Sequence, residues 1–177
     1  MTDRRRFEQQ VLPHIDAAFN LARWLTRNDH DAEDVVQDAM LRAYRYLESL
    51  RGEARPWLLA IVRNACFSWM QRNRPAEIAS GVDSEAAEAA TDPTDGPEAL
   101  LARELDRRML NEAIAALPLQ FREVLILREL EDLSYREIAR VADVPIGTVM
   151  SRLARARRLL AESVRVIAVA SRVQTEK

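Results

Sequence analysis

The sequence has little of the chemistry on which most catalytic and secreted proteins depend. Its 177 residues include one cysteine, two histidines and four glycines, and aromatic residues make up 6%. One cysteine excludes a disulfide framework, and with two histidines it is too few for a Cys/His zinc cluster. Four glycines argue against a β-sandwich or barrel, whose turns consume glycine. Because the sequence contains no catalytic Ser/His/Asp or Cys/His set and no glycine-rich phosphate loop, we expect no enzyme, no metal and no cofactor.

Long apolar runs are missing as well. The weakly polar run at 164–173 is short and carries Arg165 and Arg172, whereas a membrane span needs about 20 apolar residues. The basic start of the chain is not followed by the apolar segment of a signal peptide. We therefore expect a cytoplasmic protein that does not insert into a membrane.

The net charge of −2 conceals an uneven distribution. Residues 1–75 carry 12 basic and 10 acidic side chains, residues 76–100 carry seven acidic and no basic ones, and residues 101–177 carry 14 basic and 11 acidic ones. The middle segment has few large apolar residues, so burial cannot offset the conformational entropy that it would lose on folding. We predict two small domains, 1–75 and 101–177, joined by a flexible acidic linker, 76–100.

Apolar residues of the first segment recur at helical spacing. A stripe that starts at Phe7 follows steps of three and four residues, and Pro13 should break or kink it. A second helix is expected to begin with Asp31 as its N-cap, and a third to carry Pro56 in its first turn. The third helix is apolar on more than one face, which predicts the central element of the domain. Two aromatic residues at its apolar positions are assigned to the core: Trp57 and Trp69.

The last part of the chain predicts a helix-turn-helix. Ser134 and Glu137 have the spacing of a capping box at the start of a short helix, which should end near Ala142. A tight turn at 143–145 and a longer basic helix from about Gly147 follow. This order of elements is typical of DNA-binding domains.

The two faces of that longer helix differ in chemistry. At about 100° per residue, Val149, Leu153 and Ala156 form one apolar stripe. The opposite face presents hydroxyl and guanidinium groups, which suit hydrogen bonding to base edges in the major groove. The predicted duplex-DNA contacts on and beside this face are Thr148, Met150, Ser151, Arg152, Arg155 and Arg158.

Three motifs together resemble bacterial sigma factors, the promoter-recognition subunits of RNA polymerase. Residues 31–43 (DAEDVVQDAMLRA) resemble sigma region 2.2, and residues 55–64 (RPWLLAIVRN) resemble regions 2.3–2.4. Residues 117–118, 133–139 and 146–156 resemble region 4. Since only regions 2 and 4 are represented, in the family's order, the chain is most similar to the extracytoplasmic-function (ECF) group of the sigma-70 family.

The resemblance implies where core RNA polymerase binds. In the family, the region 2.2 helix packs on the clamp coiled coil of the β′ subunit, and region 4 binds the β flap. The implied clamp contacts lie along one side of the second helix: Asp34, Gln37, Asp38 and Arg42. Without the resemblance, an ordinary solvated helix face would be the preferred interpretation of these four residues.

The resemblance also assigns the downstream (minus-ten) promoter element to the first domain. Residues 50–55 correspond to the loop that, in this group, pockets a flipped base, and Gly52 permits close backbone approach. Phe67 offers a stacking face for an unpaired base, and Asn64 is the best candidate for a base contact. The implied set of downstream contacts is Arg51, Gly52, Arg63, Asn64, Phe67 and Arg72.

By the same resemblance, the helix-turn-helix reads the upstream (minus-thirty-five) element. Met150 departs from the family, in which many members carry a basic or polar residue, so no hydrogen bond is expected there. The acidic linker either threads the polymerase channel or serves as a solubilising spacer. An anti-sigma factor, often membrane-anchored in this group, is a further partner implied by the resemblance alone.

The sequence thus predicts an all-α, two-domain sigma factor that binds core polymerase and directs initiation at promoter DNA. The alternative is a stand-alone helix-turn-helix repressor or activator, which would need a dimerisation surface and a ligand pocket or receiver domain. A protein–protein adaptor fits less well, because arginine is concentrated at 51–75 and 145–165. The segment after Ser163 has no assigned role.

Overall fold

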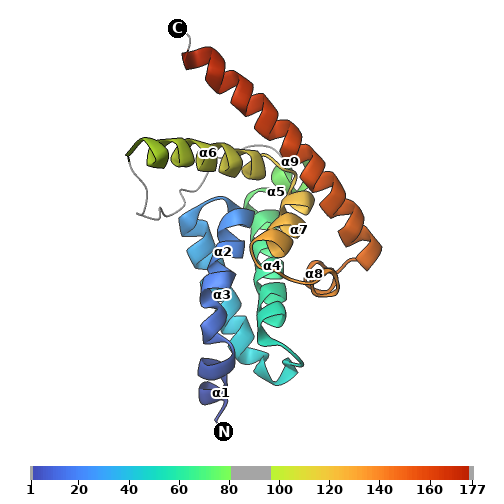
Figure 1. Ribbon diagram of the computed structural model, residues 1–177. Helices are drawn as coiled ribbons and strands as arrows, with labels where there is room; N and C mark the ends of the chain where they lie inside the picture. The colour runs from blue at the N-terminus through green and yellow to red at the C-terminus, as the bar shows by residue number, and fades with distance from the viewer. Residues whose placement is uncertain (1, 81–96, 176–177) are drawn as a thin grey trace.

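The computed structural model describes residues 2–80 and 97–175, in which every regular element is a helix (Figure 1). The predicted all-α fold is thereby confirmed. Two short 3-10 turns, Leu12–His14 and Leu47–Ser49, accompany nine α-helices in these residues. The α-helices are α1 (Asp3–Gln10), α2 (Ile15–Thr26), α3 (Asp29–Arg45), α4 (Ala54–Asn73), α5 (Pro75–Ser80), α6 (Pro97–Ala115), α7 (Leu119–Glu129), α8 (Tyr135–Ala142) and α9 (Ile146–Thr175).

Both ends of the predicted linker are helical. Residues 76–80 belong to α5 and residues 97–100 to α6, while residues 81–96 lie outside the described part of the chain. Each of these helices begins with a proline, Pro75 or Pro97, whose fixed φ and missing N–H suit the first helical position. The helices therefore extend further into the predicted linker than apolar spacing alone indicated.

Helices α2, α3 and α4 pack on one another and form the body of the first domain (Figure 1). As predicted, Pro13 interrupts the first apolar stripe: it lies in the 3-10 turn that separates α1 from α2. The side chains between the three helices are aliphatic and include Leu21, Val36 and Leu58. Trp57 and Trp69 are partly buried and pack against this core from α4.

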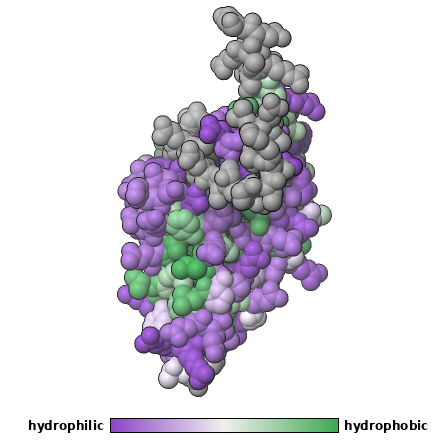
Figure 2. All heavy atoms as spheres, turned by 60° about the vertical axis from the view of Figure 1, so that its left-hand side comes forward, coloured by the Kyte–Doolittle hydropathy of each residue, from purple (hydrophilic) through white to green (hydrophobic). Residues whose placement is uncertain are grey.

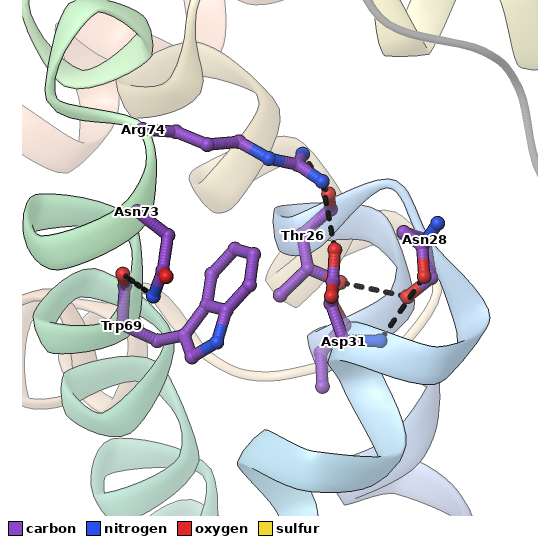
Figure 3. Close-up of polar contacts among 7 residues, drawn as sticks. Thr26, Asn28, Asp31, Trp69, Asn73 and Arg74 are labelled. Carbon is purple, nitrogen blue, oxygen red and sulfur yellow. Dashed lines mark hydrogen bonds and ion pairs between the residues drawn. The ribbon is translucent and has the colours of Figure 1, made fainter.

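At the corner between α2 and α3, the N-cap of α3 lies three residues earlier than predicted. Arg27 adopts a left-handed conformation (φ 59°) at the end of α2, so the chain turns at once and Asn28, not Asp31, caps α3. The side chain of Asn28 accepts the backbone N–H of Asp31 at 3.1 Å (Figure 3). The predicted N-cap was therefore wrong by one turn of helix.

Asp31 instead holds the end of α4. Arg74 donates to Asp31 Oδ2 at 2.7 Å and to the carbonyl oxygen of Thr26 at 2.7 Å, and its guanidinium lies 5.2 Å from the ring centre of Trp69 (Figure 3). One arginine thus ties the last turn of α4 to the α2–α3 corner.

In the second domain, α6, α7 and α8 each pack on α9 (Figure 1). The predicted capping box is present: Ser134 Oγ accepts the N–H of Glu137 at 3.2 Å, and Glu137 Oε2 accepts the N–H of Ser134 at 2.7 Å. Asp143 ends α8 in the left-handed region (φ 54°), and α9 begins three residues later at Ile146. The helix-turn-helix layout is confirmed.

The two domains pack directly against each other. Helix α7 contacts α2, α8 contacts α4, and the buried side chains of both domains form one continuous apolar cluster. Helix α4 is therefore covered by α2 and α3 on one side and by α8 on another, which explains why it is apolar on more than one face. The sequence predicted a central helix of one domain, and the structure shows a central helix of both.

Candidate nucleic-acid interface

The first candidate surface is the polar face of α9. Met150, Ser151, Arg155 and Arg158 are exposed, while Thr148 and Arg152 are half-buried. Behind them Val149, Leu153 and Ala156 are buried against the second domain, so the predicted division of the helix is confirmed. The first turns of α9 therefore present hydroxyl and guanidinium groups from a rigid, apolar-backed helix.

Two arginines of this helix are held by α7. The guanidinium of Arg155 lies 5.4 Å from the ring centre of Phe121. Arg157 donates to Glu129 Oε1 at 2.7 Å, and the pKa of Arg157 is raised because Glu129 and Tyr135 accept hydrogen bonds from it. These contacts restrict the two long side chains, which lowers the entropy that they would lose on binding a ligand.

The second candidate surface lies on α4, where the second domain covers part of it. Arg63 donates to Glu123 Oε1 of α7 at 2.5 Å, and its guanidinium lies over the ring of Phe67, 3.7 Å from the ring centre. Asn64 and Arg72 are exposed. Of the four predicted contacts on this helix, Arg63 thus contacts the second domain, Phe67 lies under Arg63, and Asn64 and Arg72 are exposed.

The partner of Arg63 is deeply buried. Glu123 is fully buried, whereas the Arg63 side chain is 16% exposed. Burial raises the pKa of the Glu123 carboxyl above its ordinary value, and the guanidinium groups of Arg63 and Arg152 oppose that rise. The charge of Glu123 therefore interacts with one arginine of each candidate surface, Arg63 of α4 and Arg152 of α9.

A second ion pair joins the two domains. Arg55 of α4 donates to Glu131 Oε2 at 2.6 Å, and Asn20 of α2 donates to Glu131 Oε1 at 2.7 Å. The Glu131 side chain is 5% exposed. Both oxygens of this buried carboxylate are thus satisfied by the first domain.

Residues 51–53 of the predicted loop, which directly precede α4, are exposed. Gly52 has φ 73°, a left-handed value that favours glycine, and Arg51 donates to the carbonyl oxygens of Glu48 and Leu50 at 2.5 and 3.1 Å. A cavity of about 440 Å³ opens beside the loop. Its walls include Arg51, Gly52 and Trp57 from the first domain and Glu137 and Arg140 from α8.

Glu123 and Glu131 were not among the predicted site residues. Each reads in sequence as one more charged residue of a helical segment, with nothing to indicate a partner 60 or 76 positions away. The available signal was the extra apolar face of α4, which requires a further packing partner.

The predicted polymerase contacts lie on and beside an apolar groove. Asp34 and Gln37 line this groove of about 1010 Å³, and Asp38 pairs with Arg42 at 2.7 Å on the same helix. The groove was not predicted, although Leu41 and Tyr44 stand out as exposed apolar side chains of α3 (58% and 48%). Figure 2 shows apolar side chains gathered on this face of the N-terminal helices within a hydrophilic surround. The apolar groove is lined by Phe7, Leu12, Ile15, Phe19, Val36, Met40, Leu41 and Tyr44.

Comparison with known families assigns both halves of the chain. Residues 11–75 match the model for sigma-70 region 2, and residues 107–160 match the model for sigma-70 region 4. The ECF RNA polymerase sigma-E factor of Haemophilus influenzae is 38% identical over 148 residues, covering 79% of this chain and 77% of that protein. The chain belongs to the ECF group of the sigma-70 family. The sigma-E factor of Escherichia coli is likewise 38% identical, over 72% of this chain and 70% of its own.

Two solved structures share the fold of this chain. The sigma factor RpoE from Bartonella quintana, solved with the anti-sigma factor NepR, is 28% identical with a TM-score of 0.74, over 92% of this chain and 98% of its own. CnrH, solved with the cytosolic domain of CnrY, is 25% identical with a TM-score of 0.64, over 92% of this chain and 90% of its own. The predicted family is thus confirmed, and it is not a family of catalytic enzymes. Within the described residues of this ECF sigma factor, no helix is both long enough and apolar enough to cross a bilayer.

Proposed function

We propose that this sigma factor binds core RNA polymerase in the cytoplasm and directs it to promoters with two separate elements. The observation that carries the proposal is the pairing of two different surfaces in one chain. One is the helix-turn-helix with its exposed hydroxyl and guanidinium face, and the other is α4 with its preceding loop. Neither surface includes a catalytic constellation.

The upstream element is assigned to α9. A helix that buries Val149 and Leu153 and exposes Ser151 and Arg155 can lie in the major groove with its N-terminal turns against base edges. Arginine pairs with guanine through two hydrogen bonds, which discriminate against a wrong base by about 1–3 kcal/mol. Arg155 and Arg158 have the exposure for this contact. Met150, also exposed, supplies an apolar contact of the kind that thymine methyl groups accept.

The downstream element is assigned to α4 and the loop at Arg51 and Gly52. Asn64 is exposed and carries both a donor and an acceptor for an unpaired base. Phe67 is an aromatic face for stacking, which is worth about 1–3 kcal/mol per base. The cavity beside Gly52 is the position at which a flipped base would enter.

Core polymerase is assigned to α3 and the apolar groove beside it. Exposed Asp34, Gln37 and Asp38 form a polar edge to an apolar floor, which is the anatomy of a protein interface. An amphipathic helix of the β′ clamp, with apolar side chains toward Leu41 and Tyr44, fits such a groove. The β flap is assigned to the second domain. An anti-sigma factor is proposed as a regulator because the similar sigma factor RpoE was solved in complex with one.

Reconstituted transcription tests the proposal. Bacterial core polymerase is incubated with fragmented genomic DNA with and without the full chain, and transcript starts are mapped. We expect new starts that share two upstream elements and depend on the chain. If the chain neither co-purifies with core polymerase nor directs new starts, and instead binds a palindromic operator alone, the repressor function replaces this one.

A further inference from the structure

The first two turns of α9 carry an exposed apolar pair beside the hydroxyl and guanidinium groups. Ile146 is 43% exposed and Met150 is 53% exposed, and they are the large apolar side chains that residues 134–160 leave exposed. Since they stand four residues apart, they lie on the same face of the helix, one turn from each other. Val149, which comes between them in sequence, is fully buried, so the pair lies outside the buried stripe of α9.

Polar groups next to the pair are engaged elsewhere. Arg157 follows Met150 by two helical turns on the same face, but it donates to Glu129 Oε1 of α7 at 2.7 Å. The Ser151 hydroxyl donates to the carbonyl oxygen of Thr148 at 3.1 Å, within its own helix. The exposed apolar atoms of the pair are therefore open to an approaching ligand.

An apolar pair at this end of a helix-turn-helix points to one chemical group of DNA. In such domains the first turns of the second helix contact base edges in the major groove. Thymine presents a methyl group there, whereas the other unmodified bases present only hydrogen-bond donors and acceptors. An amine or carbonyl group pressed against Met150 would lose its water without gaining a partner, but a methyl group is stabilised by leaving water.

We propose that Ile146 and Met150 together bind the methyl group of a thymine in the upstream promoter element. The thymine is a different base from the one assigned to Arg155, which lies five residues further along the helix. The inference rests on the proposed function and makes it more specific. It predicts that the upstream element contains a thymine that is required for its methyl group and not only for its base pair.

Replacing thymine by uracil isolates this contact. The replacement removes the methyl group and keeps the base pair and its hydrogen-bonding atoms. Burial of one such group changes an affinity by about fourfold. The double variant I146A/M150A removes the apolar surface on the protein side. Because the two changes delete opposite sides of one contact, their effects should not add.

The experiment uses the full chain assembled with bacterial core polymerase, on a promoter found by the transcript mapping described above. Each thymine of the upstream element, on either strand, is replaced in turn by uracil. Initiation is measured at subsaturating polymerase and one fixed salt concentration, because phosphate contacts are salt-dependent. Val166→Ala is the matched control for I146A/M150A, since Val166 is 69% exposed on the same helix but lies beyond the residues that match region 4. The affinity of each variant for core polymerase is measured separately.

We expect one thymine, or two adjacent ones, at which uracil lowers initiation by the parent about fourfold. The Val166→Ala chain should show the same loss there, whereas I146A/M150A should initiate equally from the thymine and uracil templates. The proposal is overturned if uracil has no effect at any position, or if I146A/M150A still loses fourfold on the uracil template. Equal initiation by I146A/M150A from both templates, combined with weaker binding to core polymerase, would assign the pair to a protein partner and overturn the proposal as well.

Failure of the methyl contact can be told apart from failure of the proposed function. If uracil has no effect while the chain still directs initiation at promoters with two elements, the proposed function stands and only the methyl contact fails. If the chain directs no initiation from unmodified DNA, both are overturned.

Discussion

Arg63 of α4 and Glu123 of α7 form an ion pair of 2.5 Å across the boundary between the two sigma domains. Arg63 is one of the residues proposed to contact the downstream promoter strand, and the Glu123 side chain is fully buried. A residue of the proposed DNA-binding surface thus has an intramolecular partner. The pair lies at the boundary where the buried apolar residues of the two domains form one continuous cluster.

Removal of Arg63 should destabilise the closed chain. Arg63→Ala leaves the Glu123 carboxylate buried and unpaired, which lowers the free energy of unfolding by about 3–5 kcal/mol. Adding Glu123→Gln should recover part of that loss, because no buried charge then remains. Urea unfolding of the two single variants, the double variant and the parent closes the thermodynamic cycle. Additive losses would show that the pair makes no energetic contact.

The two promoter surfaces should respond separately to substitution. Arg155→Ala is expected to weaken initiation by about 10-fold at promoters with the preferred upstream element and less at others, because a base contact is lost. Asn64→Ala should leave upstream recognition intact and impair strand opening, measured by permanganate reactivity of unpaired thymines. An equal loss on all sequences for Arg155→Ala would indicate a phosphate contact instead.

The apolar groove should be required for polymerase binding but not for folding. Leu41 is 58% exposed, so Leu41→Asp should change the free energy of unfolding by no more than about 0.5 kcal/mol. The same substitution places a charge in the proposed contact and should weaken binding to core polymerase at least tenfold. Val166→Asp is the matched control, since Val166 is 69% exposed and lies beyond the residues that match region 4. Equal effects of the two variants on polymerase affinity would contradict the assignment.

The ion pair at the α2–α3 corner should contribute to the stability of the first domain. Arg74→Ala removes charge-assisted hydrogen bonds to Asp31 and to the Thr26 carbonyl oxygen, worth about 1.5–3 kcal/mol together. Arg72→Ala removes an exposed arginine two residues earlier and should be close to neutral. Thermal unfolding compares the two variants; a smaller shift for Arg74→Ala than for Arg72→Ala would refute the role.

The single thiol should be inert in the folded chain. Burial raises the pKa of Cys66 to about 12, well above the value of a thiol in the unfolded chain. In the folded chain the thiol therefore keeps its proton at pH 8, and the reactive thiolate is scarce. Ellman's reagent at pH 8 should react slowly with native protein and at once in guanidinium chloride. Fast reaction in both conditions would show that the core around α4 is open.

The sequence predicts local structure well where one residue type decides it. Pro13 breaks the first helix, and Ser134 with Glu137 builds the capping box, because each effect depends on neighbours within one turn. The start of α3 was misplaced because Asn28 and Asp31 are both good N-caps. The left-handed conformation of Arg27 turns the chain at the end of α2, so that Asn28 becomes the cap. The family motifs placed regions 2 and 4 correctly, since those motifs are continuous in sequence.

The contact between the domains could not be predicted from neighbouring residues in the sequence. Glu123 and Glu131 become special through burial against residues 60 and 76 positions earlier, and burial depends on how α7 and α8 pack on α2 and α4. The apolar groove was missed for a related reason: Leu12, Ile15 and Leu41 lie on three segments that only the fold brings together. Periodicity identifies the apolar face of one helix but not the partner of that face.

The separation of the two domains in the presence of core polymerase tests the account most directly. Full chain labelled at Arg45→Cys and Glu162→Cys is measured by energy transfer alone and after addition of core polymerase. The account predicts high transfer in the free chain and low transfer in the complex, with the same initiation activity as unlabelled chain. High transfer in an initiation-competent complex would contradict it, because α4 would then read promoter DNA while still covered by the second domain.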